Sequence, residues 1–257
     1  EFGVAHRFHV ALIHLALGHP ERAYKWAREA IAVAREQQPI NLSAALIYGG
    51  FVPLFRGDLE IGLAWSEEAV ALGRKHGFAQ SMAFGRVNHG WALTRQGRGE
   101  EGVAEISEGI SVARKVAYTA LLPGNLALFA DACIAAGRVE EALETVNEAL
   151  DLVTEMGARF NACEVLWTRG DALLAQDPPR EDEAEQSYRD AIDLARDQEA
   201  KSWELRAAIH LARLWRSQGK TSAARDLLTP IYGWFTEGFD TADLKEAKAL
   251  LEELHVS

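Results

Sequence analysis

The sequence predicts an all-α fold: an α-solenoid of about six helix pairs with a C-terminal capping helix. First, a small residue recurs at steps of 39, 40, 40, 42 and 40 residues, at Ala23, Gly62, Gly102, Ala142, Ala184 and Ala224. Second, a glycine precedes it by five residues in five units, at Gly18, Gly57, Gly97, Gly137 and Gly219. Third, another small residue lies seven positions before that glycine, at Ala11, Gly50, Gly90, Ala130 and Ala212, and Gly170 takes this place in the fifth unit. A fixed period of this length is typical of stacked helix pairs.

Each unit is expected to contain a first helix, a tight turn, a second helix and a short link. The first helices are predicted at about 2–17, 41–56, 80–96, 121–136, 159–176 and 202–218. The second helices are predicted at about 20–37, 59–76, 99–116, 139–156, 181–199 and 221–232. The glycine ends the first helix because left-handed backbone geometry costs least without a Cβ. Carboxylates such as Glu100 and Glu181 lie in the first turns of second helices, where the helix dipole favours them.

The repeats divide the chain into units at 1–38, 39–77, 78–117, 118–157, 158–199 and 200–233. Pro230 breaks the pattern of the sixth unit, and a final helix near 241–254 is expected to cap the stack within 234–257. We therefore expect a single repeat domain over 1–257. The chain opens on Glu1 without a methionine and at helical spacing, so it is expected to be a fragment of a larger protein.

The amino-acid composition limits the kinds of partner and the cellular compartment that we expect. The formal charge of −11 and the pI near 5.3 argue against nucleic acid or an anionic membrane, since both attract Lys and Arg. No apolar stretch reaches the ~18 residues needed to span a bilayer, and no signal peptide is recognised at the start. Cys133 and Cys163 both fall inside predicted helices, so reduced, buried thiols in a cytoplasmic protein are expected.

The spacing of small and large residues resembles tetratricopeptide repeats, stretched from about 34 residues to about 40. That resemblance implies a right-handed solenoid. Three segments carry a closer resemblance: Arg86–Gly97, Ala200–Gly219 and Pro230–Leu251. They are similar to the C-terminal repeat region of bacterial multidomain adenylate/guanylate cyclases and related STAND/AAA-type ATPase signalling proteins. The resemblance implies that a cyclase or DNA-binding domain and an ATPase precede the repeats, and that this chain is the regulatory arm.

The search for reactive groups predicts no catalytic, cofactor-binding or metal site. Gly219-Lys220-Thr221 lacks the upstream glycine of a phosphate-binding loop, because Leu214 stands there. His6 and His9 are one helical turn apart but lack a third and a fourth ligand. Glu164 and Asp171 correspond to Arg206 and Arg213 of the next unit, so ion pairs between units are expected rather than acid–base catalysis.

In tetratricopeptide stacks the first helices line the concave surface. Mapping those positions gives a groove that is apolar in its first half and charged in its second. The partner-binding candidates are Phe51, Phe55, Phe84, Trp91, Arg95, Glu164, Trp167, Asp171, Arg206 and Arg213. Exposed aromatic clusters often mark interaction sites; the alternative is that some of these side chains pack between helices, Phe51 and Trp91 first among them.

The expected function is a non-catalytic protein–protein interaction and regulatory module of a bacterial signalling protein. Its partner would be a protein, a peptide or the ATPase domain of its own parent chain. The alternative is a small-molecule sensor that binds a metabolite inside the superhelix, near Glu164, Trp167 and Asp171.

Overall fold

The computed structural model describes residues 2–117 and 120–256. These residues form thirteen α-helices and no strand, which confirms the predicted all-α repeat fold. The helices are α1 (Phe2–Ala16), α2 (Pro20–Arg35), α3 (Pro39–Arg56), α4 (Leu59–His76), α5 (Ala79–Arg95), α6 (Gly99–Lys115), α7 (Leu122–Ala135), α8 (Val139–Met156), α9 (Arg159–Leu174), α10 (Glu181–Asp197), α11 (Lys201–Ser217), α12 (Thr221–Tyr232) and α13 (Ala242–Val256). Every predicted helix is present, with ends within two residues of those expected.

The turn glycines adopt the left-handed geometry that the sequence predicts. The φ angles of the five predicted turn glycines lie between +75° and +90°. At Gly57, for example, φ is +90°, and its backbone N–H bonds the carbonyl oxygen of Leu54 in the last turn of α3. A residue with a Cβ would be strained at this angle. The glycine therefore allows α3 to stop and α4 to fold back beside it.

The recurring small residues lie where paired helices approach most closely. A Cβ placed on Gly90 of α5 would lie 2.8 Å from the carbonyl oxygen of Gly102 in α6. A Cβ placed on Gly109 would lie 2.6 Å from the carbonyl oxygen of Ala83. In both cases the added Cβ would meet the backbone of the neighbouring helix. Backbone, unlike a flexible side chain, cannot rotate away to make room. The small columns are therefore packing positions.

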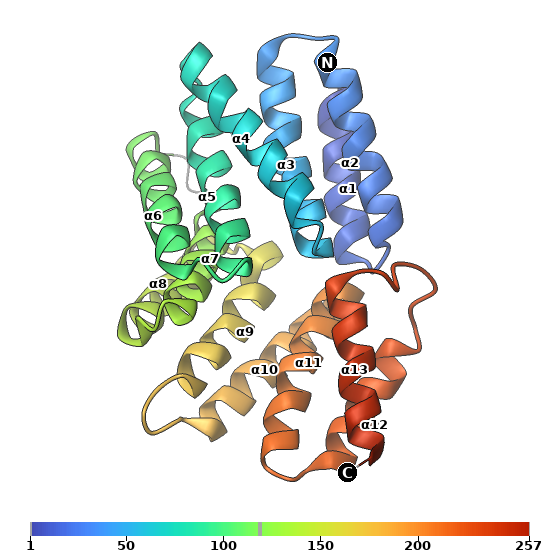
Figure 1. The fold of residues 1–257 in the computed structure, drawn as a ribbon. Helices are drawn as coiled ribbons and strands as arrows, with labels where there is room; N and C mark the ends of the chain where they lie inside the picture. The colour runs from blue at the N-terminus through green and yellow to red at the C-terminus, as the bar shows by residue number, and fades with distance from the viewer. Residues whose placement is uncertain (1, 118–119, 257) are drawn as a thin grey trace.

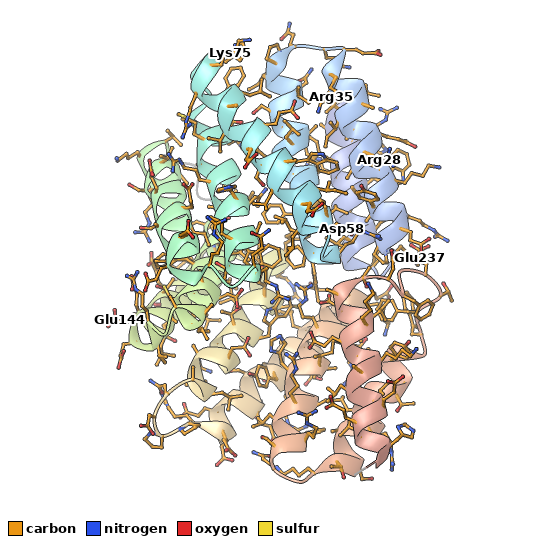
Figure 2. The ribbon with its side chains drawn as sticks, in the orientation of Figure 1. Arg28, Arg35, Asp58, Lys75, Glu144 and Glu237 are labelled. Atoms are coloured by element: carbon orange, nitrogen blue, oxygen red, sulfur yellow. The ribbon has the colours of Figure 1, made fainter. Side chains whose placement is uncertain are left out.

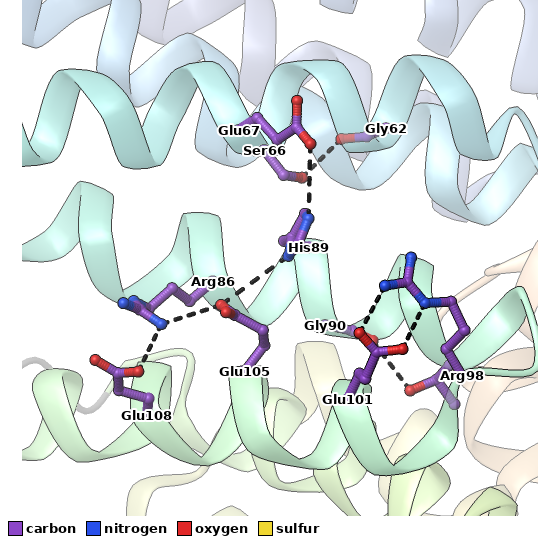
Figure 3. A network of polar contacts seen from close by, with 11 residues as sticks. Gly62, Ser66, Glu67, Arg86, His89, Gly90, Arg98, Glu101, Glu105 and Glu108 are labelled. Carbon is purple, nitrogen blue, oxygen red and sulfur yellow. Dashed lines mark hydrogen bonds and ion pairs between the residues drawn. The ribbon is translucent and has the colours of Figure 1, made fainter.

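On the outer side of α4, α5 and α6, polar side chains add contacts between helices (Figure 3). Arg86 of α5 bonds Glu105 at 3.1 Å and Glu108 at 2.6 Å, both on α6. His89 lies 3.8 Å from Glu67 of α4 and 4.0 Å from Glu105. His89 thus sits in a surface network of polar groups.

The stack curves until its two ends meet (Figure 1). The first helices α1, α3, α5, α7, α9 and α11 follow one another along the inner face, and each contacts the next. In addition, α1 contacts α11, and α13 contacts α3. Units one and two therefore touch unit six and the final helix, which nothing in the repeat pattern predicts.

Residues 233–241, here called the closing segment, make this junction. Figure 2 labels Glu237 where this segment passes the start of α2. One carboxylate oxygen of Glu237 accepts hydrogen bonds from the backbone N–H groups of Glu21 (3.2 Å) and Arg22 (3.3 Å). In return, the N–H of Gly238 donates to the Glu21 carboxylate at 3.1 Å. Asp240 pairs with Arg56 of α3 at 3.3 Å. The closing segment thus ties the chain back to its first two units.

Candidate functional site

Most of the predicted candidates line two neighbouring cavities on the inner face of the curved stack. The first, which we call the apolar cavity, has a volume of about 420 Å³ and lies between α1, α3, α7, α9 and α11. Among the described residues, five aromatic side chains line it: Tyr48, Phe51, Phe55, Phe160 and Trp203. Aliphatic side chains complete the wall, among them Leu12, Ile13, Leu15 and Leu121. Ile13 and Phe160 are 53% and 47% exposed, so the apolar lining continues to the surface.

A small polar patch interrupts this apolar wall. It consists of Asn125 from α7 together with Asn161 and Glu164 from α9. Asn125 is 1% exposed, and within the described part of the chain its side-chain Nδ2 has no hydrogen-bond partner. Burial raises the pKa of Glu164 to about 7, with Asp131 adding to the shift while Arg206 and a hydrogen bond from Asn161 oppose it. The cavity wall therefore contains an unused hydrogen-bond donor and a carboxyl group whose pKa is raised to about 7.

The second cavity, the charged cavity, has a volume of about 80 Å³. Acidic and basic side chains from α5, α7, α9, α11 and α13 line it, namely Arg95, Asp131, Glu164, Asp171, Arg206, His210, Arg213, Asp243 and Glu246. The Nε1–H of Trp91 donates to Asp131 at 3.1 Å, and burial raises the pKa of that carboxyl group. Asp171 accepts a hydrogen bond from the Tyr188 hydroxyl at 2.7 Å, and one of its oxygens lies 2.8 Å from His210 Nδ1.

An aromatic cluster lies beside both cavities. The ring of Phe55 is 4.8 Å from that of Trp91 and 5.1 Å from that of Trp203, measured between centroids. The guanidinium of Arg206 lies 4.5 Å from the Phe55 ring centroid, on the side of the charged cavity. Phe55 and Trp91 are 7% and 5% exposed, so both are chiefly packing residues.

The structure brings most of the predicted candidates to the two cavities. Phe51, Phe55 and Glu164 line the apolar cavity. The charged cavity is lined by Trp91, Arg95, Trp167, Asp171, Arg206 and Arg213, and again by Glu164. Phe84 is the exception and is corrected here: it is 1% exposed and packs in the core of the first units with Phe8 and Leu46. A side chain enclosed in that core is not available to a partner.

The predicted ion pairs between units five and six are also corrected. Instead of Glu164 and Asp171, the arginines of α11 pair with carboxylates of α13. Arg206 lies 2.6 Å from Asp243, Arg213 lies 2.5 Å from Glu246, and Arg216 pairs with Glu253. The reason is that α13 packs along α11 and brings its carboxylates closer than those of α9.

Several lining residues escaped the sequence analysis, in particular Tyr48, Asn125, Phe160, Asn161 and Trp203. Asn161 and Trp203 each lie nine residues before the small residue of their first helix, Gly170 and Ala212. That position is one helical turn before the candidates Glu164 and Arg206 in the same helices. A search extended by one turn would have found these two residues; no signal marks the other three.

Other reactive groups are few in the residues that the structure describes. Cys133 and Cys163 are free and buried, and burial raises the pKa of both thiols to about 12. Across 2–117 and 120–256, no group of three or more His, Cys, Asp or Glu side chains could hold a metal ion. No helix in these ranges is both long and apolar enough to cross a membrane. Gly219 and Lys220 form the turn between α11 and α12.

Comparison with solved structures supports the fold. NprR in complex with its cognate peptide NprX matches with a TM-score of 0.67 and 15% identity, over 100% of this chain and 73% of NprR. A STAND protein with a tetratricopeptide repeat sensor, PH0952 from Pyrococcus horikoshii, matches with a TM-score of 0.53 and 13% identity, over 97% of this chain and 38% of that protein. These similarities show the tetratricopeptide-like fold.

Sequence comparison identifies one relative and one family. An uncharacterized protein of Rhizobium meliloti (strain 1021), R02095, is 28% identical over 160 residues, which are 62% of this chain. The chain spans only 16% of the length of that relative. The family model of anaphase-promoting complex subunit 5 matches residues 2–48 and 132–218, just over half of the chain. The chain therefore belongs to the family that this model describes, anaphase-promoting complex subunit 5.

Proposed function

We propose that this chain is a non-catalytic regulatory module that binds a peptide or protein segment in the apolar cavity. The observation that carries the proposal is the cavity itself: about 420 Å³ of space with five aromatic side chains in its walls and exposed Ile13 and Phe160 at its edge. Monomeric proteins rarely leave such apolar surface unused, and grooves of this kind hold peptides by a few anchoring side chains. The similarity to NprR with its bound peptide supports this use of the inner face.

The signalling context is a further part of the proposal. The chain would form one repeat domain over 1–257 within a longer cytoplasmic bacterial protein, downstream of an ATPase and a cyclase or DNA-binding output domain. Its match to 16% of the Rhizobium meliloti relative is what one region of a long protein would give. The similarity to a STAND protein with a repeat sensor supports the ATPase connection. A ligand that prefers one state of the module would shift the balance between active and inactive parent protein.

The proposal is tested with a substitution that fills the cavity with a larger side chain. A library of random peptides is selected against the wild-type chain, and the Kd of an enriched synthetic peptide is measured for two variants. Leu12→Trp places an indole in the cavity, whereas Ser111→Trp adds the same ring to an exposed position of α6. We expect Leu12→Trp to weaken binding at least tenfold and Ser111→Trp to leave it unchanged. Failure to enrich any peptide, or equal Kd values for the two variants, would overturn the proposal.

The parent's own ATPase domain is tested in the same way. The polypeptide that precedes this chain in its protein is expressed separately and its binding to the wild-type chain is measured. Binding that Leu12→Trp abolishes and Ser111→Trp preserves would make that domain an occupant of the cavity. Binding that neither variant changes would place the ATPase contact elsewhere on the module.

A small-molecule sensor is the second candidate. The cavity volume lies within the range of about 300–1,000 Å³ that small-molecule sites occupy. A metabolite panel is screened by the shift in Tm that each compound causes. A compound that stabilises the wild type and Ser111→Trp, but not Leu12→Trp, would favour this candidate over the peptide.

A further inference from the structure

The polar patch inside the apolar cavity lacks partners of its own. Asn125 is 1% exposed, and its Nδ2 donor is without a hydrogen bond among the described residues. A buried donor without an acceptor costs free energy, so most such groups in folded proteins are paired. Asn125 lines the cavity, and an acceptor placed there by a ligand would satisfy its amide.

Glu164 gives the patch its charge. Its side chain is buried, and no described cation lies within ion-pairing distance of its carboxylate. Arg206, the basic residue that acts on it most strongly, instead pairs with Asp243 at 2.6 Å. A buried carboxylate without a cation is unfavourable, and a positively charged ligand would relieve this.

Both groups line the apolar cavity. Asn161 hydrogen-bonds Glu164, and its Nδ2 lies within 2.5 Å of where a Cβ on Gly124 would stand. Asn125 follows Gly124 on α7, and α7 packs against α9, so the amide and the carboxylate come from neighbouring helices. A ligand in the cavity meets one hydrogen-bond donor, Asn125 Nδ2, and one acceptor that can carry negative charge, the Glu164 carboxylate.

The walls suit the same kind of ligand. Aromatic faces attract organic cations, and aromatic cages that hold ammonium groups are a known use of this attraction. The cavity supplies Tyr48, Phe51, Phe160 and Trp203, and also Phe55, whose ring already faces the Arg206 guanidinium in the neighbouring cavity. Aliphatic residues on α1 add space for an apolar side chain.

We propose that the apolar cavity binds a primary ammonium group that is followed by a carbonyl and carries an apolar side chain, as at the amino terminus of a peptide. The ammonium donates to Glu164, the carbonyl accepts from Asn125 Nδ2, and the apolar side chain lies against the aromatic walls. This inference rests on the proposed function and specifies which end of the partner enters. The same chemistry is present in a free apolar amino-acid amide, so the experiment must separate the two sources.

The groups around Glu164 define how its charge responds to pH. Arg206 faces it from α11 and Asp131 from α7, while Asp171, His210 and Asp243 line the charged cavity on its other side. His9 from α1 and Arg159 from α9 also line the apolar cavity. With a pKa of about 7, the carboxylate is mostly protonated at pH 6 and mostly ionised at pH 8. Binding of a cation should therefore strengthen by about tenfold over this range.

The first experiment measures Kd values by calorimetry or ligand-observed NMR with three probes: L-phenylalaninamide, N-acetyl-L-phenylalaninamide and phenethylamine. For the wild type, acetylation of the amino group should weaken binding at least tenfold. In Glu164→Gln this discrimination should fall below threefold. The exposed control Glu155→Gln should behave as the wild type. Equal binding of the free and acetylated amides, or no binding of either free amine at 10 mM (about −2.7 kcal/mol), would overturn the proposal.

The second experiment separates the two contacts. Phenethylamine has the ammonium group but no carbonyl, so its Kd should be the same in Asn125→Leu as in the wild type. The Kd of L-phenylalaninamide, which has both groups, should rise at least threefold in this variant. The substitution removes an unpaired buried amide, so the fold is expected to persist. Phenethylamine stays protonated from pH 6 to pH 8, as lysine does with a pKa of about 10.4. Its tenfold gain in affinity over this range should disappear in Glu164→Gln, and a gain retained there would contradict the assignment.

The third experiment distinguishes the sources and separates this inference from the proposed function. The peptide Phe-Ala-Ala-Ala-amide should bind at least tenfold more tightly than L-phenylalaninamide if a peptide terminus is the ligand. Equal affinity would support a free amino-acid amide as the occupant. If a selected peptide loses affinity in Leu12→Trp yet tolerates N-acetylation, the proposed function stands and the ammonium site is wrong.

Discussion

Arg206 of α11 donates a hydrogen bond from Nη2 to the carbonyl oxygen of Phe55 in α3, at 3.3 Å, across 151 residues of sequence. The same guanidinium lies over the Phe55 ring, 4.5 Å from its centroid, and bonds Asp243 of α13 at 2.6 Å. One side chain therefore joins the second unit, the sixth unit and the final helix. It thus links the second unit of the stack to its last unit.

Replacing Arg206 should loosen this junction. Arg206→Met leaves the Asp243 carboxylate, 20% exposed, without its cation and the Phe55 carbonyl without its donor. We expect the free energy of unfolding to fall by about 1–3 kcal/mol, below the cost of breaking a fully buried pair. Urea denaturation measures it. The matched control, Arg114→Met, breaks an exposed pair with Glu148 and should cost less than about 1 kcal/mol. Equal losses would mean that the Arg206 contacts do not hold the ends together.

Glu237 should protect the backbone amides at the start of α2 from hydrogen exchange. Its N-cap residue, His19, makes no side-chain cap, and the carboxylate of Glu237 bonds the N–H groups of Glu21 and Arg22 instead. Glu237→Ala removes this cap and is expected to cost about 1 kcal/mol. Hydrogen exchange should become faster at the amides of Glu21, Arg22 and Gly238. Unchanged exchange there, with Glu155→Ala as the surface control, would show that the closing segment does not cap α2.

A substitution at Gly90 tests whether the recurring small residues are packing positions. Gly90→Leu forces a side chain against the Gly102 carbonyl and Ile106, where even a Cβ would lie within 2.8 Å of backbone. Overpacking of this kind costs about 1–3 kcal/mol or more, because backbone cannot rotate away. Ser111→Leu introduces the same side chain at an exposed position of α6 and should change the free energy of unfolding by less than about 0.5 kcal/mol. A Tm for Gly90→Leu equal to that of the control would refute the column assignment.

Glu164 should make stability depend on pH. Its pKa in the folded chain is about 7, above the ordinary value of 4.5, so folding favours the protonated carboxyl. This contribution is complete below about pH 4.5 and is lost as the pH rises to 7. Glu164→Gln removes the titration, so its stability relative to the wild type should rise by about 1–3 kcal/mol between pH 4.5 and pH 8. Denaturant midpoints at several pH values measure this difference. A constant difference would mean that Glu164 ionises normally in the folded chain.

The sequence by itself determined the helices and their pairing. The period of about 40 residues, the turn glycines and the small columns are local or nearest-neighbour features, and a solenoid is built from such features. Gly57 ends α3 and Gly90 lets α5 approach α6 for reasons that can be stated without the rest of the chain. For the same reason the concave positions of Phe51, Glu164 and Arg206 could be predicted from their columns.

The tertiary structure determined which residues line the cavities of the inner face. Small rotations between units add up over the stack, and their sum brought α13 against α3, a contact that no single repeat encodes. That closure placed Arg206 against the Phe55 carbonyl, tied Glu237 to α2 and brought α1 and α3 together with α11 around the apolar cavity. Asn125 and Glu164 both line this apolar cavity, which the repeat pattern does not reveal because its walls come from both ends of the stack. The repeat determines the pairs of neighbours, and the accumulated curvature determines which distant residues form the site.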